Sequence, residues 1–295
     1  LHPRVRRQRQ MCIRDRNTQR WAAVLVIAAL VVIGAFAWYS QRRTSRFIQS
    51  TTPTLFFHGG GSSYHAEEHM VNAAKKAGVT KTVLRADVSK SGQVTLHGTM
   101  QRHAINPIVE VNYQNNRQLD FQKHGEWAGN VVRVLQQRYG IKKVNMVGHS
   151  LGNISIIYYE LQNGRNPRVP QLQKQVDIAG HFAGLNFAGL PAAIRQPQRL
   201  KLAKDGKPNK MNATYRGMTK VRQVYPQGQV AVLDIVGDTG HGTDGTVPNV
   251  SSLSLKYLVA SRAKSYQVKV FHGKNAQHSK LHSNPAVDRA LIKFL

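Results

Sequence analysis

The residues Gly148-His149-Ser150-Leu151-Gly152 have the spacing G-x-S-x-G, in which a serine hydroxyl stands on a sharp turn between a strand and a helix. A hydroxyl is a weak nucleophile until a positioned base takes its proton. An apolar strand pattern (144–147) precedes the motif and a helical pattern (154–161) follows it. Small residues at both ends of the motif avoid collisions with the neighbouring strand and helix. Ser150 is therefore the predicted nucleophile of an acyl-transfer reaction.

A later glycine-rich loop offers an acid. In this chemistry the acid and the base follow the nucleophile in the order Ser, Asp/Glu, His. The strand pattern 230–236 leads into a loop that contains Asp238 and Asp244. Asp238 follows the strand directly and is interpreted as a turn-former, a common role for Asp. Asp244, in Asp-Gly-Thr-Val-Pro, is the preferred acid, and Asp238 remains the alternative.

The base is expected in the loop after the last strand pattern, 266–271, which contains three histidines. His278 stands seven residues before Pro285 and a closing helical pattern, and it is the preferred base. His282 remains the alternative. His272 is still close to the strand and is expected to be structural.

The same chemistry needs an oxyanion hole, a pair of backbone N–H groups that bind the charge developing on the carbonyl oxygen. One donor is expected to be the N–H of Leu151, the residue after the nucleophile. The other is expected in His58-Gly59-Gly60-Gly61, an HGGG-type loop after an early strand pattern. Adjacent glycines let the backbone approach a substrate closely. Gly60 is the predicted second donor.

Strand and helix patterns alternate along the chain after residue 52, which predicts an α/β protein with a mainly parallel sheet flanked by helices. Together with the serine motif this favours one domain of the α/β-hydrolase fold, residues 53–295. Residues 185–226 are polar, basic and weakly patterned, and they are expected to form a lid-like insertion. The strand patterns are 54–57, 82–88, 93–96, 108–113, 144–147, 176–179, 230–236 and 266–271, and the helical patterns are 67–77, 121–139, 154–161 and 286–295.

Residues 21–40 form an apolar segment, bounded by aromatic residues, that is long enough to cross a membrane as a helix. Seven Arg precede it and three follow it closely, so the heavier positive side is expected in the cytoplasm. This predicts a basic cytoplasmic tail (1–20), a single-pass anchor (21–40), a linker (41–52) and an extracellular catalytic domain. The first sixteen residues are given no functional weight. The alternative is a signal peptide cleaved after Ala35-Phe36-Ala37, followed by secretion.

The chain of 295 residues has a net charge of +28. Residues 1–46 hold ten Arg and one Asp, so +19 remains for the rest. Such an excess attracts anionic partners, here acidic lipid head groups or an anionic cell-envelope polymer. Nucleic-acid binding is not expected, because no helix-turn-helix, zinc-finger or RNP-like motif is present. Cys12 is the only cysteine, which excludes an intramolecular disulfide.

The run His65-Ala66-Glu67-Glu68-His69 matches H-x-x-E-H, a zinc-protease pattern. Two histidines four residues apart on a helix share a face and can bind Zn²⁺, given a third ligand downstream. However, the run follows the predicted oxyanion loop directly, where a hydrolase needs a plain helix. We interpret it as a solvated helix start and expect no metal.

Four segments resemble one family in the same order: TLFFHGGGSS, VNMVGHSLGN, TDGTVPNVSSL and AQHSKLHSNPAV. The family is that of the Gram-positive cell-surface α/β-hydrolases of unknown function, which are lipase-like and membrane-anchored. The resemblance covers roughly 53–295 and implies Ser150, Asp244 and His278 as a triad, with Gly60 and Leu151 at the oxyanion hole. Asn153 departs from the second glycine of GHSxGG, and this could alter the packing behind the turn.

The prediction is therefore a serine esterase, without cofactor, that acts on a small-molecule or lipid acyl ester at the cell surface. A non-catalytic, basic envelope-binding protein on the same scaffold is the alternative from another class.

Overall fold

The computed structural model describes residues 3–44 and 47–295. The chain divides into two compact units, residues 1–47 and 48–295, which are described separately.

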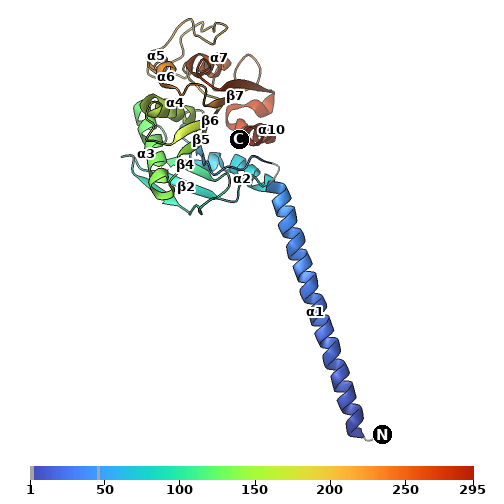
Figure 1. The fold of residues 1–295 in the computed structure, drawn as a ribbon. Coiled ribbons are helices and arrows are strands. Elements are labelled where there is room, and N and C mark those ends of the chain that lie inside the picture. Colours follow the sequence, from blue (N-terminus) through green and yellow to red (C-terminus); the bar gives the residue numbers. More distant parts are fainter. Residues whose placement is uncertain (1–2, 45–46) are drawn as a thin grey trace. The chain divides into compact units, whose positions relative to one another are not determined.

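The first unit is one helix, α1 (Pro3–Thr44), drawn in blue in Figure 1. Its segment Arg20–Ser40 has 21 apolar-rich residues and is long enough to cross a membrane, since it spans about 31 Å at 1.5 Å per residue. Trp21 and Phe36 are 70% and 73% exposed, as expected for side chains that suit a lipid environment. The helix runs into the segment predicted as a linker, and residues 45 and 46 of that segment lie outside the described residues.

Within residues 47–295 the second unit contains a sheet of eight strands in the order β3-β2-β4-β1-β5-β6-β7-β8. The strands are β1 (Thr54–Phe57), β2 (Val83–Val88), β3 (Val94–His97), β4 (Ile108–Tyr113), β5 (Lys143–His149), β6 (Gln171–Ile178), β7 (Ala231–Asp238) and β8 (Ser265–His272). Neighbouring strands pair in parallel, except that β3 pairs antiparallel with β2. The predicted mainly parallel sheet and the eight strand patterns are confirmed.

Helices cover both faces of this sheet. They are α2 (Glu68–Ala77), α3 (Phe121–Tyr139), α4 (Gly152–Asn163), α5 (Ala213–Met218), α6 (Val221–Val224), α7 (Asn249–Leu253), α8 (Leu255–Val259), α9 (His278–Leu281) and α10 (Pro285–Phe294), with short 3-10 turns at Tyr64–Ala66 and Lys274–Ala276. The α/β architecture with flanking helices is the predicted fold class (Figure 1).

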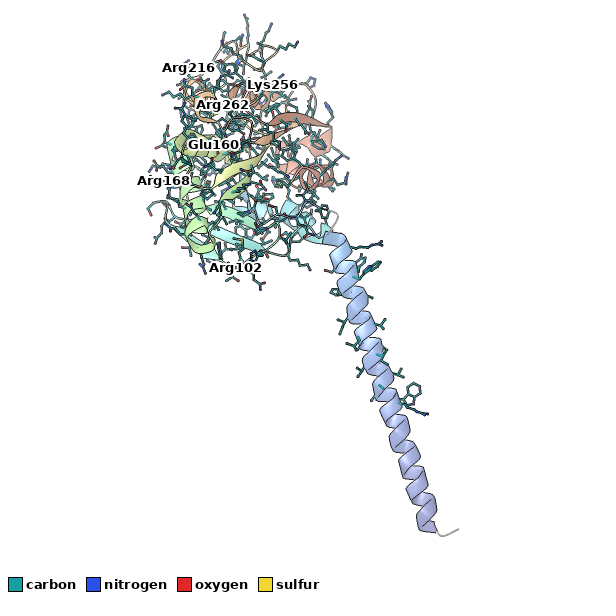
Figure 2. All side chains as sticks on the ribbon, viewed as in Figure 1. Arg102, Glu160, Arg168, Arg216, Lys256 and Arg262 are labelled. Atoms are coloured by element: carbon teal, nitrogen blue, oxygen red, sulfur yellow. The ribbon has the colours of Figure 1, made fainter. Side chains whose placement is uncertain are left out.

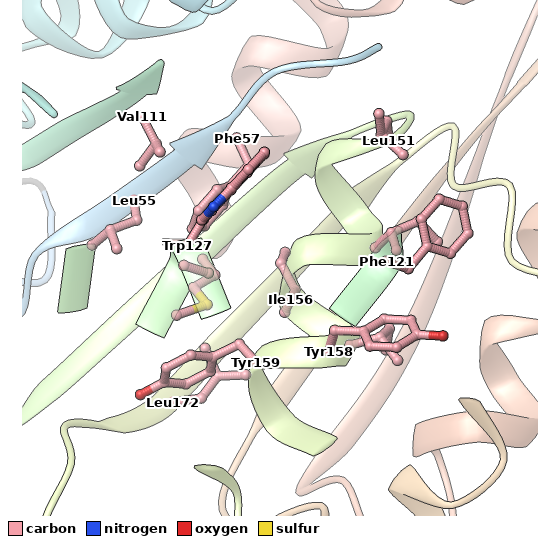
Figure 3. Packing of buried hydrophobic residues seen from close by; sticks show 14 of the residues in the cluster. Leu55, Phe57, Val111, Phe121, Trp127, Leu151, Ile156, Tyr158, Tyr159 and Leu172 are labelled. Carbon is pink, nitrogen blue, oxygen red and sulfur yellow. The ribbon is translucent and has the colours of Figure 1, made fainter. Parts of the chain in front are cut away.

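The strands separate two apolar cores, because successive side chains of a strand point to opposite faces. Leu55 and Phe57 of β1 pack with α3 and α4 in the first core, and Phe56 packs with α2 and α10 in the second. Figure 3 shows the first core, where Trp127 of α3 and Ile156 of α4 lie against the sheet. The inner strands β1, β4, β5 and β7 are buried along nearly their whole length, which explains their apolar-rich sequences. The edge strands β3 and β8 are largely exposed, and their sequences alternate between apolar and polar residues.

The parallel arrangement determines where polar side chains can meet. The loops after β1, β5, β6, β7 and β8 all leave the same edge of the sheet, where the carboxyl ends of the strands lie. Ligands of open α/β sheets bind at this edge. The predicted nucleophile, acid, base and oxyanion donor all lie in these loops.

The predicted insertion, 185–226, contains only the short helices α5 and α6 and two isolated β-bridges, Leu185 with Arg195 and Leu202 with Pro208. Its weak sequence pattern reflects this irregular backbone. β6 begins five residues earlier than its apolar pattern, because its first half is polar and only partly buried.

Candidate active site

Ser150 stands between the end of β5 and the start of α4 with a backbone φ of +52°. A residue other than glycine pays a steric cost in this left-handed region, and such strain concentrates at functional sites. The N–H of Ser150 donates to the carbonyl of Ile178 at the end of β6, at 2.9 Å. The turn is therefore sharp and attached to the neighbouring strand.

The two glycines of the motif make this turn possible. A Cβ on Gly148 would lie 2.6 Å from the backbone N of Asn153 in α4. A Cβ on Gly152 would overlap the carbonyl oxygen of Phe57 in β1. Backbone atoms cannot move aside easily, so larger residues at either position would push the helix or the strand away.

Asn153, the departure from the second glycine of the family pattern, is fully buried behind the turn. Its side-chain amide donates to the carbonyls of Ser150, at 3.0 Å, and Ile178, at 2.9 Å, and its Oδ1 accepts from the N–H of Ile178 at 3.3 Å. Asn153 thus joins the nucleophile turn to the end of β6, a role that glycine has no side chain to perform.

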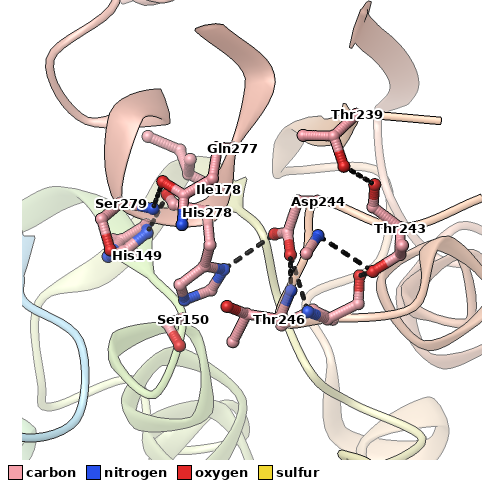
Figure 4. Close-up of polar contacts among 12 residues, drawn as sticks. His149, Ser150, Ile178, Thr239, Thr243, Asp244, Thr246, Gln277, His278 and Ser279 are labelled. Carbon is pink, nitrogen blue, oxygen red and sulfur yellow. Dashed lines mark hydrogen bonds and ion pairs between the residues drawn. The ribbon is translucent and has the colours of Figure 1, made fainter. Parts of the chain in front are cut away.

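Asp244 and His278 are joined by a hydrogen bond of 2.7 Å between Asp244 Oδ2 and His278 Nδ1 (Figure 4). Both residues are buried. The other carboxylate oxygen of Asp244 accepts from the backbone N–H groups of Thr246, at 2.8 Å, and Val247, at 2.6 Å. The N–H of His278 also donates to the carbonyl of Asp244 at 2.9 Å. The loops after β7 and β8 therefore hold the carboxylate and the imidazole in one orientation.

Ser150 and His278 line one cavity of about 540 Å³ at the carboxyl edge of the sheet. In Figure 4 the Ser150 side chain lies beside the His278 ring, at the edge that is turned away from Asp244. The remaining wall is mainly apolar and comes partly from the insertion. The other lining residues are Gly60, Gly61, Arg117, Leu119, Phe121, Leu151, His181, Leu185, Phe187, Leu190, Ile194, Thr246 and Ser279.

The amides of Gly60 and Leu151, the two predicted oxyanion donors, both belong to residues on this wall. Neither N–H donates a hydrogen bond to any residue in the described part of the chain, whereas the N–H of Gly61 donates to the carbonyl of Asn116. Leu151 also precedes α4, whose N-terminal end carries partial positive charge. Two unpaired donors on one wall, one of them at a helix N-terminus, suit a developing oxyanion.

His58 explains the direction of the Gly60 amide, and sequence reasoning did not assign it a role. Its Nε2 accepts from the N–H of Tyr113 at 3.0 Å, so its Nδ1 carries the proton and donates to the carbonyl of Gly59 at 2.9 Å. Because C=O and N–H point to opposite sides of a trans peptide, this bond turns the N–H of Gly60 the other way. Burial lowers the pKa of His58 and favours the neutral ring that this arrangement needs.

His149, between Gly148 and Ser150, contacts the base, and the sequence had not assigned it a role. Its Nε2 donates to the backbone carbonyl of His278 at 3.1 Å, and the two rings lie 4.8 Å apart. Burial, with His278 and His282 nearby, lowers the pKa of His149 well below its ordinary value. A neutral His149 therefore supports the backbone under His278 without adding charge.

Asp238, His272 and His282, the other acid and bases considered, do not line the cavity that contains Ser150. Asp238 faces His272, 3.8 Å away, and the side chain of His272 is 72% exposed. His282 contacts His149, with 4.9 Å between ring centres, and does not line the cavity. The structure thus brings Asp244 and His278 together and separates the other three from them.

His181, in the loop after β6, was not singled out in the sequence. It is buried, lines the cavity and has an Nδ1 without a partner among the described residues. Burial lowers its pKa to about 4, which leaves a neutral ring at the cavity wall. Only its position directly after a strand could have pointed to it.

The two histidines of the H-x-x-E-H run face different carboxylates. His65 lies 3.1 Å from Glu68, and His69 lies 3.3 Å from Asp288 of α10. No group of three or more His, Cys, Asp or Glu side chains among the described residues could hold a metal ion. The interpretation as a solvated helix start is wrong for Glu67, which is 1% exposed and whose pKa burial and Glu110 raise to about 8.

Comparisons with known proteins agree with the α/β-hydrolase fold. The model of a family described as alpha/beta hydrolase of unknown function (DUF915) matches residues 41–295. The crystal structure of the product of the Listeria innocua gene lin2722 superposes with a TM-score of 0.73 at 24% identity, covering 83% of this chain and 94% of that one. A Lactobacillus plantarum WCFS1 protein, provisionally described as a cell surface hydrolase, has a TM-score of 0.64 at 18% identity, covering 82% and 88%. At these identities the likeness concerns the fold. The search of curated proteins gave no match.

Proposed function

Because the chain belongs to the family of alpha/beta hydrolases of unknown function matched over residues 41–295, we propose that it is a serine esterase that works through an acyl-enzyme intermediate. The observation that carries the proposal is the 2.7 Å bond from Asp244 to His278 beside a cavity that Ser150 also lines. A strained serine, a buried carboxylate–imidazole pair and an apolar wall meet at one place. This combination suits attack on the carbonyl of an acyl ester.

In the proposed mechanism Asp244 accepts a hydrogen bond from His278 Nδ1–H, which keeps the proton on Nδ1 and leaves the lone pair of Nε2 free. Nε2 takes the hydroxyl proton of Ser150 as Oγ attacks the ester carbonyl. The tetrahedral intermediate collapses, the ester C–O bond breaks, and the leaving alcohol takes that proton from His278. Water then repeats the sequence on the acyl-enzyme, releasing the acid and restoring Ser150. Asp244 orients the ring and stabilises its charged form.

The oxyanion of each intermediate is proposed to bind to the N–H groups of Gly60 and Leu151. Removing one such donor typically costs about 10²–10³ in rate. The bond from His58 Nδ1 to the carbonyl of Gly59 supports this arrangement, because it aims the Gly60 amide before substrate binds.

The site is proposed to lie outside the cell, anchored by the apolar segment Arg20–Ser40. The excess of Arg before this segment favours a cytoplasmic N-terminus. The description of the Lactobacillus plantarum protein as a cell surface protein is in line with that location.

The test is a panel of chromogenic acyl esters of increasing chain length, hydrolysed by the full chain in neutral detergent and by its Ser150→Ala variant. Wild-type hydrolysis that Ser150→Ala abolishes supports the proposal, as does a mass increase on Ser150 after treatment with a serine-directed phosphonate. Ser279→Ala, which alters another serine of the cavity wall, is the matched control. Ester hydrolysis that survives in Ser150→Ala would overturn the proposal.

A further inference from the structure

The lining of the cavity contains a positively charged side chain and no negatively charged one. Among its lining residues Arg117 is the one Lys or Arg, and no Asp or Glu lines the cavity. Asp244 is the one carboxylate among the described residues that forms a hydrogen bond with the base. It is buried and also accepts hydrogen bonds from two backbone amides. The wall around the nucleophile is therefore mainly apolar and carries one cationic side chain, that of Arg117.

Arg117 lies directly against the oxyanion loop. A Cβ built on Gly61 would be 3.3 Å from a terminal nitrogen of the Arg117 guanidinium. The chain reaches this place because the carbonyl of Asn116, next to Arg117, accepts the N–H of Gly61. The guanidinium is thus one residue away from Gly60, whose N–H is the proposed oxyanion donor.

The guanidinium of Arg117 forms no polar contact with another residue in the described part of the chain. Arg117 is exposed and makes no hydrogen bond or ion pair with any other described residue. The carboxylate nearest in sequence, Asp120, instead begins α3 by accepting the N–H of Gln122 at 3.1 Å. A planar fork of N–H donors remains available, and it matches the geometry of a phosphate or a carboxylate.

The insertion, residues 185–226, adds apolar wall and positive charge to this part of the protein. It supplies Leu185, Phe187, Leu190 and Ile194 to the apolar wall. Residues 185–226 hold nine Lys or Arg and one Asp, a net charge of +8. A positive field at the mouth of a cleft raises the local concentration of anionic ligands. The apolar wall suits an acyl chain, and the net positive charge of the insertion that supplies part of this wall favours an anionic ligand.

We propose that the substrate is an acyl ester carrying an anionic oxygen group, a phosphate or a carboxylate, close to the scissile carbonyl, and that Arg117 binds this group. The inference rests on the proposed function of Ser150 and specifies its substrate class. Arg117 is a specificity-determining residue, since it recognises a part of the substrate that does not react.

The test uses three esters with the same hexanoyl group: neutral hexanoylglycerol, hexanoylglycerol phosphate and the hexanoyl ester of glyceric acid. Hexanoate release by the full chain in neutral detergent gives kcat/KM for each. The wild type is expected to prefer an anionic ester by about tenfold or more, and Arg117→Gln to lower that preference by roughly 10- to 100-fold. Arg117→Lys should fall between them, because an ammonium keeps the charge and loses the fork.

Arg102→Gln is the matched control, because it removes the same charge at a distant place. Figure 2 shows Arg102 at the end of the second unit opposite the end that carries Arg216 of the insertion. This control should retain the wild-type preference. The two anionic esters identify the group, since a phosphate preference and a carboxylate preference give different rankings.

Equal kcat/KM for neutral and anionic esters in the wild type, or an unchanged preference in Arg117→Gln, would overturn the inference about Arg117. Both results would leave the serine esterase standing if Ser150→Ala is inactive. Hydrolysis that persists in Ser150→Ala would instead overturn the proposed function itself, so the two failures are distinguishable.

Discussion

The buried carboxylate of the candidate site and the two buried carboxylates inside the sheet differ in the number of hydrogen bonds that they accept. Asp244, in the loop after β7, accepts hydrogen bonds from His278 and from the N–H groups of Thr246 and Val247. Asp177 of β6 and Asp234 of β7 are in register with each other inside the sheet. Each has one side-chain donor, Gln175 for Asp177 and Tyr266 for Asp234.

The sheet carboxylates are left partly unsatisfied. The Oδ1 atoms of Asp177 and Asp234 are buried and have no partner within the described part of the chain. Burial raises the pKa of Asp234 to about 7, and burial together with Asp234 raises that of Asp177 well above its ordinary value. Burial alone therefore does not make a carboxylate suitable for orienting a base. Donors on both oxygens hold the Asp244 side chain in one orientation, whereas Asp177 and Asp234 each keep one buried oxygen without a donor among the described residues.

The largest effect is expected for Asp244→Asn, which tests whether this carboxylate orients the base. The amide keeps the size of the side chain but cannot stabilise a charged imidazole or select the right tautomer, so kcat for an acyl ester should fall by about 10⁴-fold. The melting temperature should change little by comparison. Steady-state kinetics and thermal unfolding measure both quantities. Asp238→Asn, a matched change in the same loop, should retain activity, and the reverse pattern would identify Asp238 as the acid.

Asp234→Asn tests whether the buried carboxylate of β7 is protonated in the folded protein. Below pH 3.8 the folded and unfolded states both hold the proton of Asp234, and between about 4 and 7 only the folded state does. Rising pH therefore lowers the free energy of unfolding over this range, by on the order of 4 kcal/mol in total for a shift of about three pH units. The asparagine variant lacks this contribution.

The measurement is chemical unfolding of wild type and Asp234→Asn from pH 4 to 8. The variant should become more stable relative to the wild type as pH rises to about 7, and the difference should then level off. Esterase activity should be retained, since Asp234 does not line the cavity. A difference that does not vary with pH would mean that Asp234 is already ionised at pH 4 in the folded state.

The sequence predicted the region of Asp244 better than that of Asp234. The inner strands were recognisable because burial on both faces makes them rich in apolar residues, whereas the exposed edge strands β3 and β8 showed an alternating pattern. The loops after β1, β5, β7 and β8 carry the glycines and polar residues of the site. The order of Ser150, Asp244 and His278 then limited the possible pairings. The choice of Asp244 over Asp238 rested on local context, and the structure gives the spatial reason, since Asp244 contacts His278.

What the sequence could not predict depends on contacts between distant segments. The bond from His58 to Tyr113, the position of Arg117 against Gly61 and the burial of His181 all arise when loops from different strands meet. Glu67 was misjudged for the same reason, because a helical pattern on one segment does not show what packs over it. The irregular insertion gave almost no periodic signal at all.

Asn153 connects the two regions, since it ties the turn of Ser150 to the end of β6, one residue after Asp177. Asn153→Ala removes two buried hydrogen bonds, while the backbone N–H groups of Asn153 and Ser150 still donate to the carbonyls of Ser150 and Ile178. The lost bonds should cost about 1–3 kcal/mol of stability. Because the turn loses its support, kcat should also fall. Asn163→Ala, at the far end of α4, removes one buried amide bond to Tyr159 and should reduce stability without lowering kcat. If both variants lose kcat equally, the effect is general loosening of α4.

The smallest effect is expected for Tyr266→Phe, which separates the hydrogen bond of Asp234 from its burial. The hydroxyl donates to Asp234 Oδ2 at 2.7 Å and lowers a pKa that burial raises. Without it the pKa of Asp234 should rise further, so the fall in stability with pH should extend above pH 7, and the lost bond should cost about 1 kcal/mol. Tyr257→Phe is the matched control, because its ring packs against Arg222 and its hydroxyl has no hydrogen-bond partner among the described residues. If the free energy of unfolding of Tyr266→Phe follows that of the wild type in parallel at every pH, burial alone sets the pKa of Asp234. The difference between Asp234 and Asp244 would then lie in the number of backbone N–H groups that donate to each carboxylate.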